Sequence, residues 1–241
     1  MKKSRNKPLY KSFVVLKKNV QNRRRLNLLK FKKKKWEKLI NYIRRLQNRR
    51  KKNFKVYDIN RYYLPKFYNS FKKKYEYMLH TKKKFRIFYG NVTNKFLKKN
   101  IKTVLKQKSK MLKHNLNFNS FFLKLWESRI DVVLYRSHFV PSISAAKQLI
   151  FHKHISINGK SIKDSSLKLK KGDLVTINNQ ARSIIYQNIK NTHFWPISPY
   201  YLQINYKTLE IYFLSHIETH NFSASFPFWL DIYTLLRYYD K

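Results

Sequence analysis

Residues 129–177 read RIDVVLYRSHFVPSISAAKQLIFHKHISINGKSIKDSSLKLKKGDLVTI, and this stretch decides the fold. Apolar residues recur at helical spacing from Ile130 to Leu134, and Pro141 ends that pattern. Ser142 stands where a helix N-cap belongs, because its hydroxyl can accept a hydrogen bond from the first turn. The inner side of this second helix consists of Ala145, Ala146, Leu149 and Ile150. The sequence therefore predicts two short amphipathic helices in succession.

Strand and turn signals follow the second helix. His154–Ile157 alternates polar and apolar residues, which is the period of a half-buried strand. Asn158-Gly159 predicts a tight turn because both residues tolerate positive φ. Lys171–Asp173 predicts a second turn, and Leu174–Ile177 predicts another strand. The fold class is therefore α+β, with two short helices packed on a small mixed or antiparallel sheet.

The polar residues of this scaffold are of the types that bind RNA. Arginine and lysine neutralise phosphates, whereas glutamine, asparagine and histidine supply directional hydrogen bonds to sugars and base edges. The predicted RNA contacts are Arg129, Arg136, Ser142, Lys147, Gln148, His152, Lys153, His154, Asn158 and Lys160.

The order of these residues resembles the RNA-binding module of the bacterial-type ribosomal protein S4 family of the small subunit. That module has a Tyr-Arg pair, an Ala-Arg-Gln run, a His-x-His-Ile segment and an Asn-Gly turn. This chain offers Tyr135-Arg136, Ala146-Lys147-Gln148, His152–Ile155 and Asn158-Gly159 in the same order. The resemblance implies a protein that binds small-subunit rRNA and lies against neighbouring small-subunit ribosomal proteins.

The resemblance extends to both flanks and covers roughly residues 76–241. Lys82–Gly90 is similar to a basic stretch ahead of the family module, and Phe96–Lys99 is similar to the basic-aromatic run that ends the next helix, also ahead of the module. It adds Arg86, Lys98 and Lys99 to the predicted RNA contacts. Phe118–Trp126 resembles the helix that leads into the module, and residues 178–241 resemble the C-terminal part of mitochondrial versions.

Three departures from the family pattern alter these expectations. The chain has no cysteine, so the zinc knuckle of many bacterial relatives is absent and cysteine-based metal sites are excluded. Ile143 stands where the family often has arginine, which removes one phosphate contact. Lys153 replaces the glycine between the two family histidines and restores a charge nearby. We therefore expect a shifted set of contacts.

The charge of the chain points to the same class of partner. It carries 55 Lys+Arg against 11 Asp+Glu, for a net charge of +44. Charges of the same sign repel one another, so a chain this basic needs a partner of opposite charge, and nucleic acid is the obvious candidate. A membrane surface is the rival partner, but the sequence has no apolar run of bilayer length and no secretory signal near its start.

The charge is unevenly distributed and alone indicates three zones; the helical pattern that resumes at residue 76 divides the first zone, which makes four parts. Residues 1–128 carry 41 basic and 4 acidic side chains, 129–177 carry 9 and 3, and 178–241 carry 5 and 4. We predict a basic, partly helical, RNA-associated extension over 1–75 and a helical domain over 76–128. The RNA-binding module follows at 129–177. The last part, 178–241, is predicted to be a near-neutral, β-rich extension that packs on protein. We also predict a helix over Lys33–Arg50 in the first part and a strand over Tyr201–Tyr206 in the last part.

The residue usage suggests the compartment. The chain has 18 Tyr, 18 Phe and only 3 Gly, a bias towards residues with AT-rich codons. Organelle genomes are often AT-rich, so we expect a mitochondrial protein bound to ribosomes of the matrix. A plastid is the less favoured organelle, and an AT-rich nuclear or bacterial genome is the remaining alternative.

Catalysis, metal binding and cofactor binding have little support in the sequence. His152 and His154 share a face of an extended chain, but two ligands do not make a metal site. There is no nucleophile elbow, and no glycine-rich loop that could hold a nucleotide. We expect no catalytic residues, no cofactor and no small-molecule substrate.

The predicted function is therefore that of a structural constituent of the small ribosomal subunit. The resemblance implies a role early in assembly and a position near the side where mRNA enters. Similar modules occur in rRNA pseudouridine synthases, in tyrosyl-tRNA synthetases and in small RNA-binding stress proteins. A free-standing RNA-binding regulator and an rRNA-modifying enzyme therefore remain as alternatives, although neither flank here has the pattern of a catalytic domain.

Overall fold

The computed structural model describes residues 71–107, 118–190, 198–215 and 230–239, together with a few isolated positions. The chain divides into two compact units, Val92–Thr219 and Met1–Asn91 with His220–Lys241. The predicted helix over Lys33–Arg50 lies outside the described ranges, apart from four of its residues. The four-part division by charge stays a prediction.

The unit that holds the chain ends is built on α3 (Phe71–Phe88), with α10 (Ile232–Arg237) packed against it. Lys82 on α3 donates a hydrogen bond from Nζ to the Tyr238 hydroxyl at 3.0 Å and also lies over that ring. The predicted helical domain over 76–128 begins in this unit. The structure interrupts it, because Gly90 and Asn91 both adopt positive φ and end the first helix.

The other unit begins with α4 (Asn94–Lys106), capped by the Thr93 hydroxyl, which accepts from the Phe96 N–H at 3.3 Å. Leu97, Ile101 and Val104 are buried because helical spacing places them on one side. This side packs on α6 (Phe118–Glu127), the predicted helix that leads into the module.

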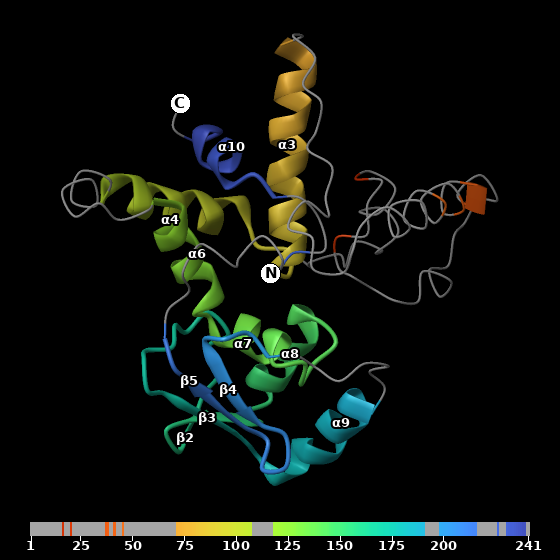
Figure 1. The fold of residues 1–241 in the computed structure, drawn as a ribbon, viewed down its shortest axis with the longest axis vertical. Coiled ribbons are helices and arrows are strands. Elements are labelled where there is room, and N and C mark those ends of the chain that lie inside the picture. Colours follow the sequence, from red (N-terminus) through yellow and green to blue (C-terminus); the bar gives the residue numbers. More distant parts are fainter. Residues whose placement is uncertain are drawn as a thin grey trace, which may run out of the picture. The chain divides into compact units, whose positions relative to one another are not determined.

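The two predicted module helices are confirmed as α7 (Ile130–Arg136) and α8 (Ile143–Phe151). They pack directly against each other (Figure 1). The Ser142 hydroxyl accepts from the Ala145 N–H at 3.2 Å, as the N-cap prediction requires. Ile143 is only 3% exposed. The residue that departs from the family pattern thus belongs to the apolar core of the module.

The sheet has five strands in the order β2-β1-β3-β5-β4, and every paired neighbour is antiparallel. The strands are β1 (Ile155–Ile157), β2 (Lys160–Ser161), β3 (Leu174–Ile177), β4 (Leu202–Asn205) and β5 (Glu210–Phe213). Asn158 and Gly159 both have positive φ in the turn between β1 and β2, as predicted. Helices and an antiparallel sheet together confirm the α+β class.

The chain after the module extends the module's own sheet. Strand β5 pairs with β3, and β4 completes the edge, which confirms the strand predicted near Tyr201–Tyr206 (Figure 1). The sequence does not predict α9 (Asn179–Lys190), which lies between β3 and β4 in the chain. Tyr186 on α9 donates to the Lys207 carbonyl at 2.6 Å and ties this helix to the β4–β5 turn. No described helix combines the length and apolar character needed to span a bilayer.

Candidate nucleic-acid interface

The candidate interface is centred on the loop that joins α8 to β1. Its backbone forms a Schellman motif: the Lys153 N–H donates to the Ile150 carbonyl at 2.9 Å, and the His154 N–H to the Leu149 carbonyl at 3.1 Å. Lys153 has φ +60°, the left-handed conformation that this motif requires. The geometry explains why a glycine would be favoured here, and shows that this chain accepts lysine.

A second set of hydrogen bonds ties the loop to Asn178, the residue that follows β3. The Asn178 side chain donates to the Lys153 carbonyl at 2.8 Å, and the Asn178 N–H donates to the His154 carbonyl at 2.9 Å. The loop is thus held at both ends while its side chains face solvent. His152 and Lys153 are exposed, and His154 is half-buried.

Other predicted contacts flank this loop on consecutive elements. Gln148 is exposed on α8, one turn before the loop, and Lys160 is exposed on β2. Among the described residues, none of the carboxylates forms an ion pair with Lys153 or Lys160. These side chains therefore keep their charge and hydrogen-bonding groups for a partner.

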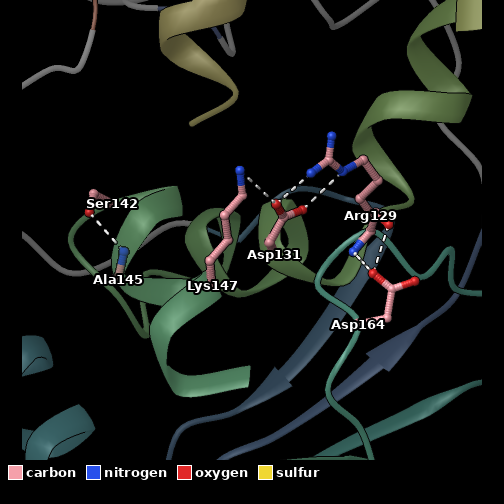
Figure 2. A network of polar contacts seen from close by, with 7 residues as sticks. Arg129, Asp131, Ser142, Ala145, Lys147 and Asp164 are labelled. Atoms are coloured by element: carbon pink, nitrogen blue, oxygen red, sulfur yellow. Dashed lines mark hydrogen bonds and ion pairs between the residues drawn. The ribbon is translucent and has the colours of Figure 1, made fainter. Parts of the chain in front are cut away.

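Arg129 and Lys147 converge on one buried carboxylate, Asp131 (Figure 2). Arg129 donates from Nε to Asp131 Oδ1 at 3.1 Å and from Nη2 to Oδ2 at 2.6 Å, in a two-pronged pair. Lys147 Nζ lies 3.9 Å from Asp131 Oδ2. The Arg129 guanidinium also lies 5.5 Å from the Phe96 ring centre and 5.3 Å from that of Trp126. Arg129 thereby links α4, α6 and α7.

Burial dominates the electrostatics of this cluster. Loss of hydration raises the pKa of the Asp131 carboxyl, although the charges of Arg129 and then Lys147 oppose the shift. Burial lowers the pKa of Lys147, partly offset by the attraction of Asp131. The Arg129 side chain is 5% exposed and that of Lys147 is 30% exposed. Lys147 can therefore reach a phosphate, whereas Arg129 mainly organises the protein.

Arg136 has a similar internal role. It donates from Nε to Glu127 Oε2 at 2.8 Å and from Nη2 to Oε1 at 2.9 Å, and the Glu127 side chain is fully buried. The Tyr201 hydroxyl donates to the same carboxylate at 3.2 Å. Burial first, and Glu127 second, raise the pKa of Tyr201 well above its ordinary value. The ion pair thus anchors the start of β4 to the module, and RNA contact by Arg136 stays a prediction.

Asn158 and Ser142 also stabilise the fold. Asn158 donates from Nδ2 to Asp173 Oδ1 at 3.0 Å and accepts from the Leu174 N–H at 2.9 Å, which holds the two predicted turns together. Ser142 uses its hydroxyl as the N-cap of α8. For both residues the structure gives a local reason for the residue type, and contact with RNA stays a prediction.

A second basic surface lies along α4. The predicted contacts Lys98 and Lys99 are exposed there. The same exposed side carries three lysines that the sequence analysis did not name: Lys95, Lys102 and Lys106. Lys95 and Lys102 lie three or four residues from Lys98 and Lys99, and Lys106 lies four residues after Lys102, which is the helical spacing that identifies them. Arg86 is half-buried on α3 and belongs to the other unit.

Within the described residues, no group of three histidine, cysteine or carboxylate side chains could hold a metal ion. The histidines of the loop lie close together, with the ring centres of His152 and His154 6.1 Å apart. What this part of the molecule offers is a set of exposed cations, amides and rings on a rigid backbone, which suits recognition of RNA.

Comparison with known proteins agrees with this arrangement. The S4 domain model matches residues 128–175, which include α7, α8, the loop and β1 to β2. A small ribosomal subunit protein uS4m from Reclinomonas americana is 32% identical over 194 residues, or 74% of this chain and 72% of the relative. The chain belongs to the uS4 family of small ribosomal subunit proteins.

Bacterial uS4 proteins are similar over comparable lengths. The uS4 protein of Rickettsia canadensis is 31% identical over 176 residues, which is 72% of this chain and 81% of that protein. The uS4 protein of Rickettsia prowazekii is 39% identical over a shorter region of 118 residues. The uS4 resemblance therefore extends well beyond the matched domain at residues 128–175.

Proposed function

We propose that this uS4 protein is a structural constituent of the small ribosomal subunit that binds and organises small-subunit rRNA. Family membership supports the assignment, and one structural observation carries the mechanism. Gln148, His152, Lys153 and Lys160 project from consecutive elements whose backbones are fixed by the Schellman motif, Asn178 and the sheet. A rigid, exposed set of donors loses little conformational entropy on binding.

The chemistry of binding is phosphate neutralisation combined with shape. Exposed lysines of α4 and of the α8–β2 region lie within the same compact unit. They would contact the RNA backbone, while the amide and imidazole groups would read sugars or unpaired bases. Nothing in this mechanism requires a bond to be made or broken, so the role is structural and not catalytic.

The finer parts of the proposal concern place and time. We infer that the protein acts in the mitochondrial matrix, supported by the relative named uS4m and by the bias of the sequence towards amino acids with AT-rich codons. A plastid is the alternative compartment. The proposal includes a role early in subunit assembly, a position near the side where mRNA enters, and contacts with neighbouring small-subunit proteins.

The test is the salt dependence of binding between the full chain and a transcript of its own small-subunit rRNA. If six to ten phosphates are neutralised, the affinity falls by about a thousand-fold or more between roughly 50 and 200 mM salt. A flat response would contradict the electrostatic mechanism.

A pair of matched variants locates the contact. Changing Lys153 and Lys160 together to glutamine should reduce the slope of log affinity against log salt by about one for each lysine. The control changes Lys190 and Lys207, which are exposed in the same unit but outside the module. Equal effects of the two pairs would show that the module loop is not the reader.

A further inference from the structure

Phe151 is the last residue of α8 and is 69% exposed, although the loop that follows it is held by several backbone hydrogen bonds. The apolar side of α8 is filled by Ile143, Ala146 and Ile150, all buried. Phe151 therefore contributes little to the core, and its ring needs another explanation. It shares the solvent side of the helix with Gln148 and His152, both predicted RNA contacts.

The surroundings of the ring are aromatic and cationic. The ring centres of Phe151 and His152 lie 5.8 Å apart at 78°, and His154 follows at 6.1 Å from His152. Lys153 is exposed between the two histidines, and none of the described carboxylates pairs with it. Single-stranded nucleic acid is bound by this combination, because the ring stacks on a base while the cation contacts the adjacent phosphate.

The ring is also held on a fixed backbone. Phe151 lies within the Schellman motif, whose hydrogen bonds run from Lys153 and His154 back to Ile150 and Leu149, and the Asn178 side chain donates to the carbonyl of Lys153 at 2.8 Å. An aromatic side chain has few rotatable bonds, so its presentation from this loop costs little entropy on binding. The Phe151 ring therefore offers a flat apolar face to a partner from a backbone that is already fixed.

We propose that Phe151 stacks on an unpaired base of the bound RNA, with His152 and His154 at its edge and Lys153 on the neighbouring phosphate. The proposal rests on the proposed function, because it names the part of the RNA that this loop reads. We propose an unpaired base as the occupant because the ring lies beside His152 and is followed in the chain by Lys153 and His154, residue types that recognise nucleic acid. An RNA strand is favoured over a protein partner because it supplies both a base for the ring and, next to it, a phosphate for the exposed Lys153.

The test separates stacking from electrostatics. Phe151→Ala should weaken binding to the small-subunit rRNA transcript by about 5- to 150-fold, the range for loss of one base–aromatic stack. The slope of log affinity against log salt should stay unchanged because no charge is removed. Phe151→Tyr keeps the ring and should restore affinity to near that of the unchanged chain.

The matched control is Ile184→Ala, which truncates another exposed apolar residue of the same unit on α9. It should leave affinity unchanged. Circular dichroism of each variant establishes that the fold is retained, as expected for two residues outside the core.

The outcomes distinguish this inference from the proposed function. Tight, salt-dependent binding by the unchanged chain together with an unaffected Phe151→Ala variant would overturn the stacking proposal alone. So would a loss accompanied by a changed salt slope, or an equal loss in Phe151→Tyr. No binding by the unchanged chain would overturn the proposed function and the inference together.

Discussion

Arg129 and Asp131 hold opposite charges where water is excluded. The Asp131 side chain is fully buried and that of Arg129 is 5% exposed. Two charges in such a place are tolerated because the pair is two-pronged and Lys147 adds a second positive charge nearby. The Phe96 and Trp126 rings lie within 6 Å of the guanidinium. The pair therefore connects the helices that carry the module.

Removing one partner should be costly. Arg129→Ala leaves a buried carboxylate without its main counter-charge, so we expect the free energy of unfolding to fall by about 3–5 kcal/mol. Chemical denaturation of the full chain measures the change. Lys170→Ala, at an exposed lysine of the same module, should change stability by less than about 0.5 kcal/mol. Similar small effects of both variants would show that the buried pair does not hold the helices together.

The raised pKa of Asp131 gives a pH dependence with a defined sign. Burial makes the folded chain bind this proton more tightly than the unfolded chain, where the pKa is about 3.9. The contribution of Asp131 is therefore most favourable below about pH 4 and is lost as pH rises through its folded-state pKa. The observable is the difference in unfolding free energy between the unchanged chain and Asp131→Asn, which does not titrate there. That difference should decrease between about pH 4 and pH 7, and an increase would contradict the assignment.

At the scale of the elements, the end of α8 decides how the loop is presented. A lysine with φ +60° at this position is strained, because its Cβ crowds the backbone in the left-handed conformation. The Asn178 bonds and the pairing of β1 with β3 maintain it. The chain thus places a charge where the backbone geometry favours glycine.

Glycine at this position should separate stability from binding. Lys153→Gly relieves the strain, so the free energy of unfolding should rise by about 1 kcal/mol. RNA affinity should fall, with a salt slope smaller by about one phosphate contact. Lys153→Gln removes the charge but keeps the strained φ, so it should lose affinity without gaining stability. A stability gain in the glutamine variant would mean that the backbone conformation is not the cause.

The elements of the module and strand β4 follow from local signals, whereas α9 and the pairing of β5 with β3 do not. The Ser142 cap, the Asn158-Gly159 turn and the periodicities on either side predict α7, α8, β1 and β3 because those signals act over a few residues. Helix α9 has a mixed surface, with only Ala181 and Ile185 buried along its length. The pairing of β5 with β3 depends on contacts across the fold that no local pattern contains.

The residues of the candidate site likewise divide into those that the sequence identifies and those that only the structure identifies. The sequence indicates the residue types for RNA binding, and the structure separates those that are exposed from those with internal roles. Arg129 and Arg136 pair with Asp131 and Glu127, which lie only two and nine residues away, but burial of these carboxylates is visible only in the fold. Lys102 and Phe151 were missed because exposure, and not residue type alone, identifies them.

At the scale of the whole molecule, charge and family lead to the same assignment. A net charge of +44 on 241 residues opposes a compact, unbound state unless a polyanion supplies counter-charge. The uS4 family proteins that resemble the chain are named as constituents of the small ribosomal subunit. Residence in a ribosome provides the phosphate backbone that this charge requires.

Sedimentation of the native protein tests the central claim most directly. Organelle lysate is layered on a gradient in high salt, and the chain is followed together with small-subunit rRNA. The account predicts that the protein migrates with the small ribosomal subunit and remains there after weakly bound proteins are removed. A pool that stays at the top of the gradient, or that sediments with membranes, would contradict it.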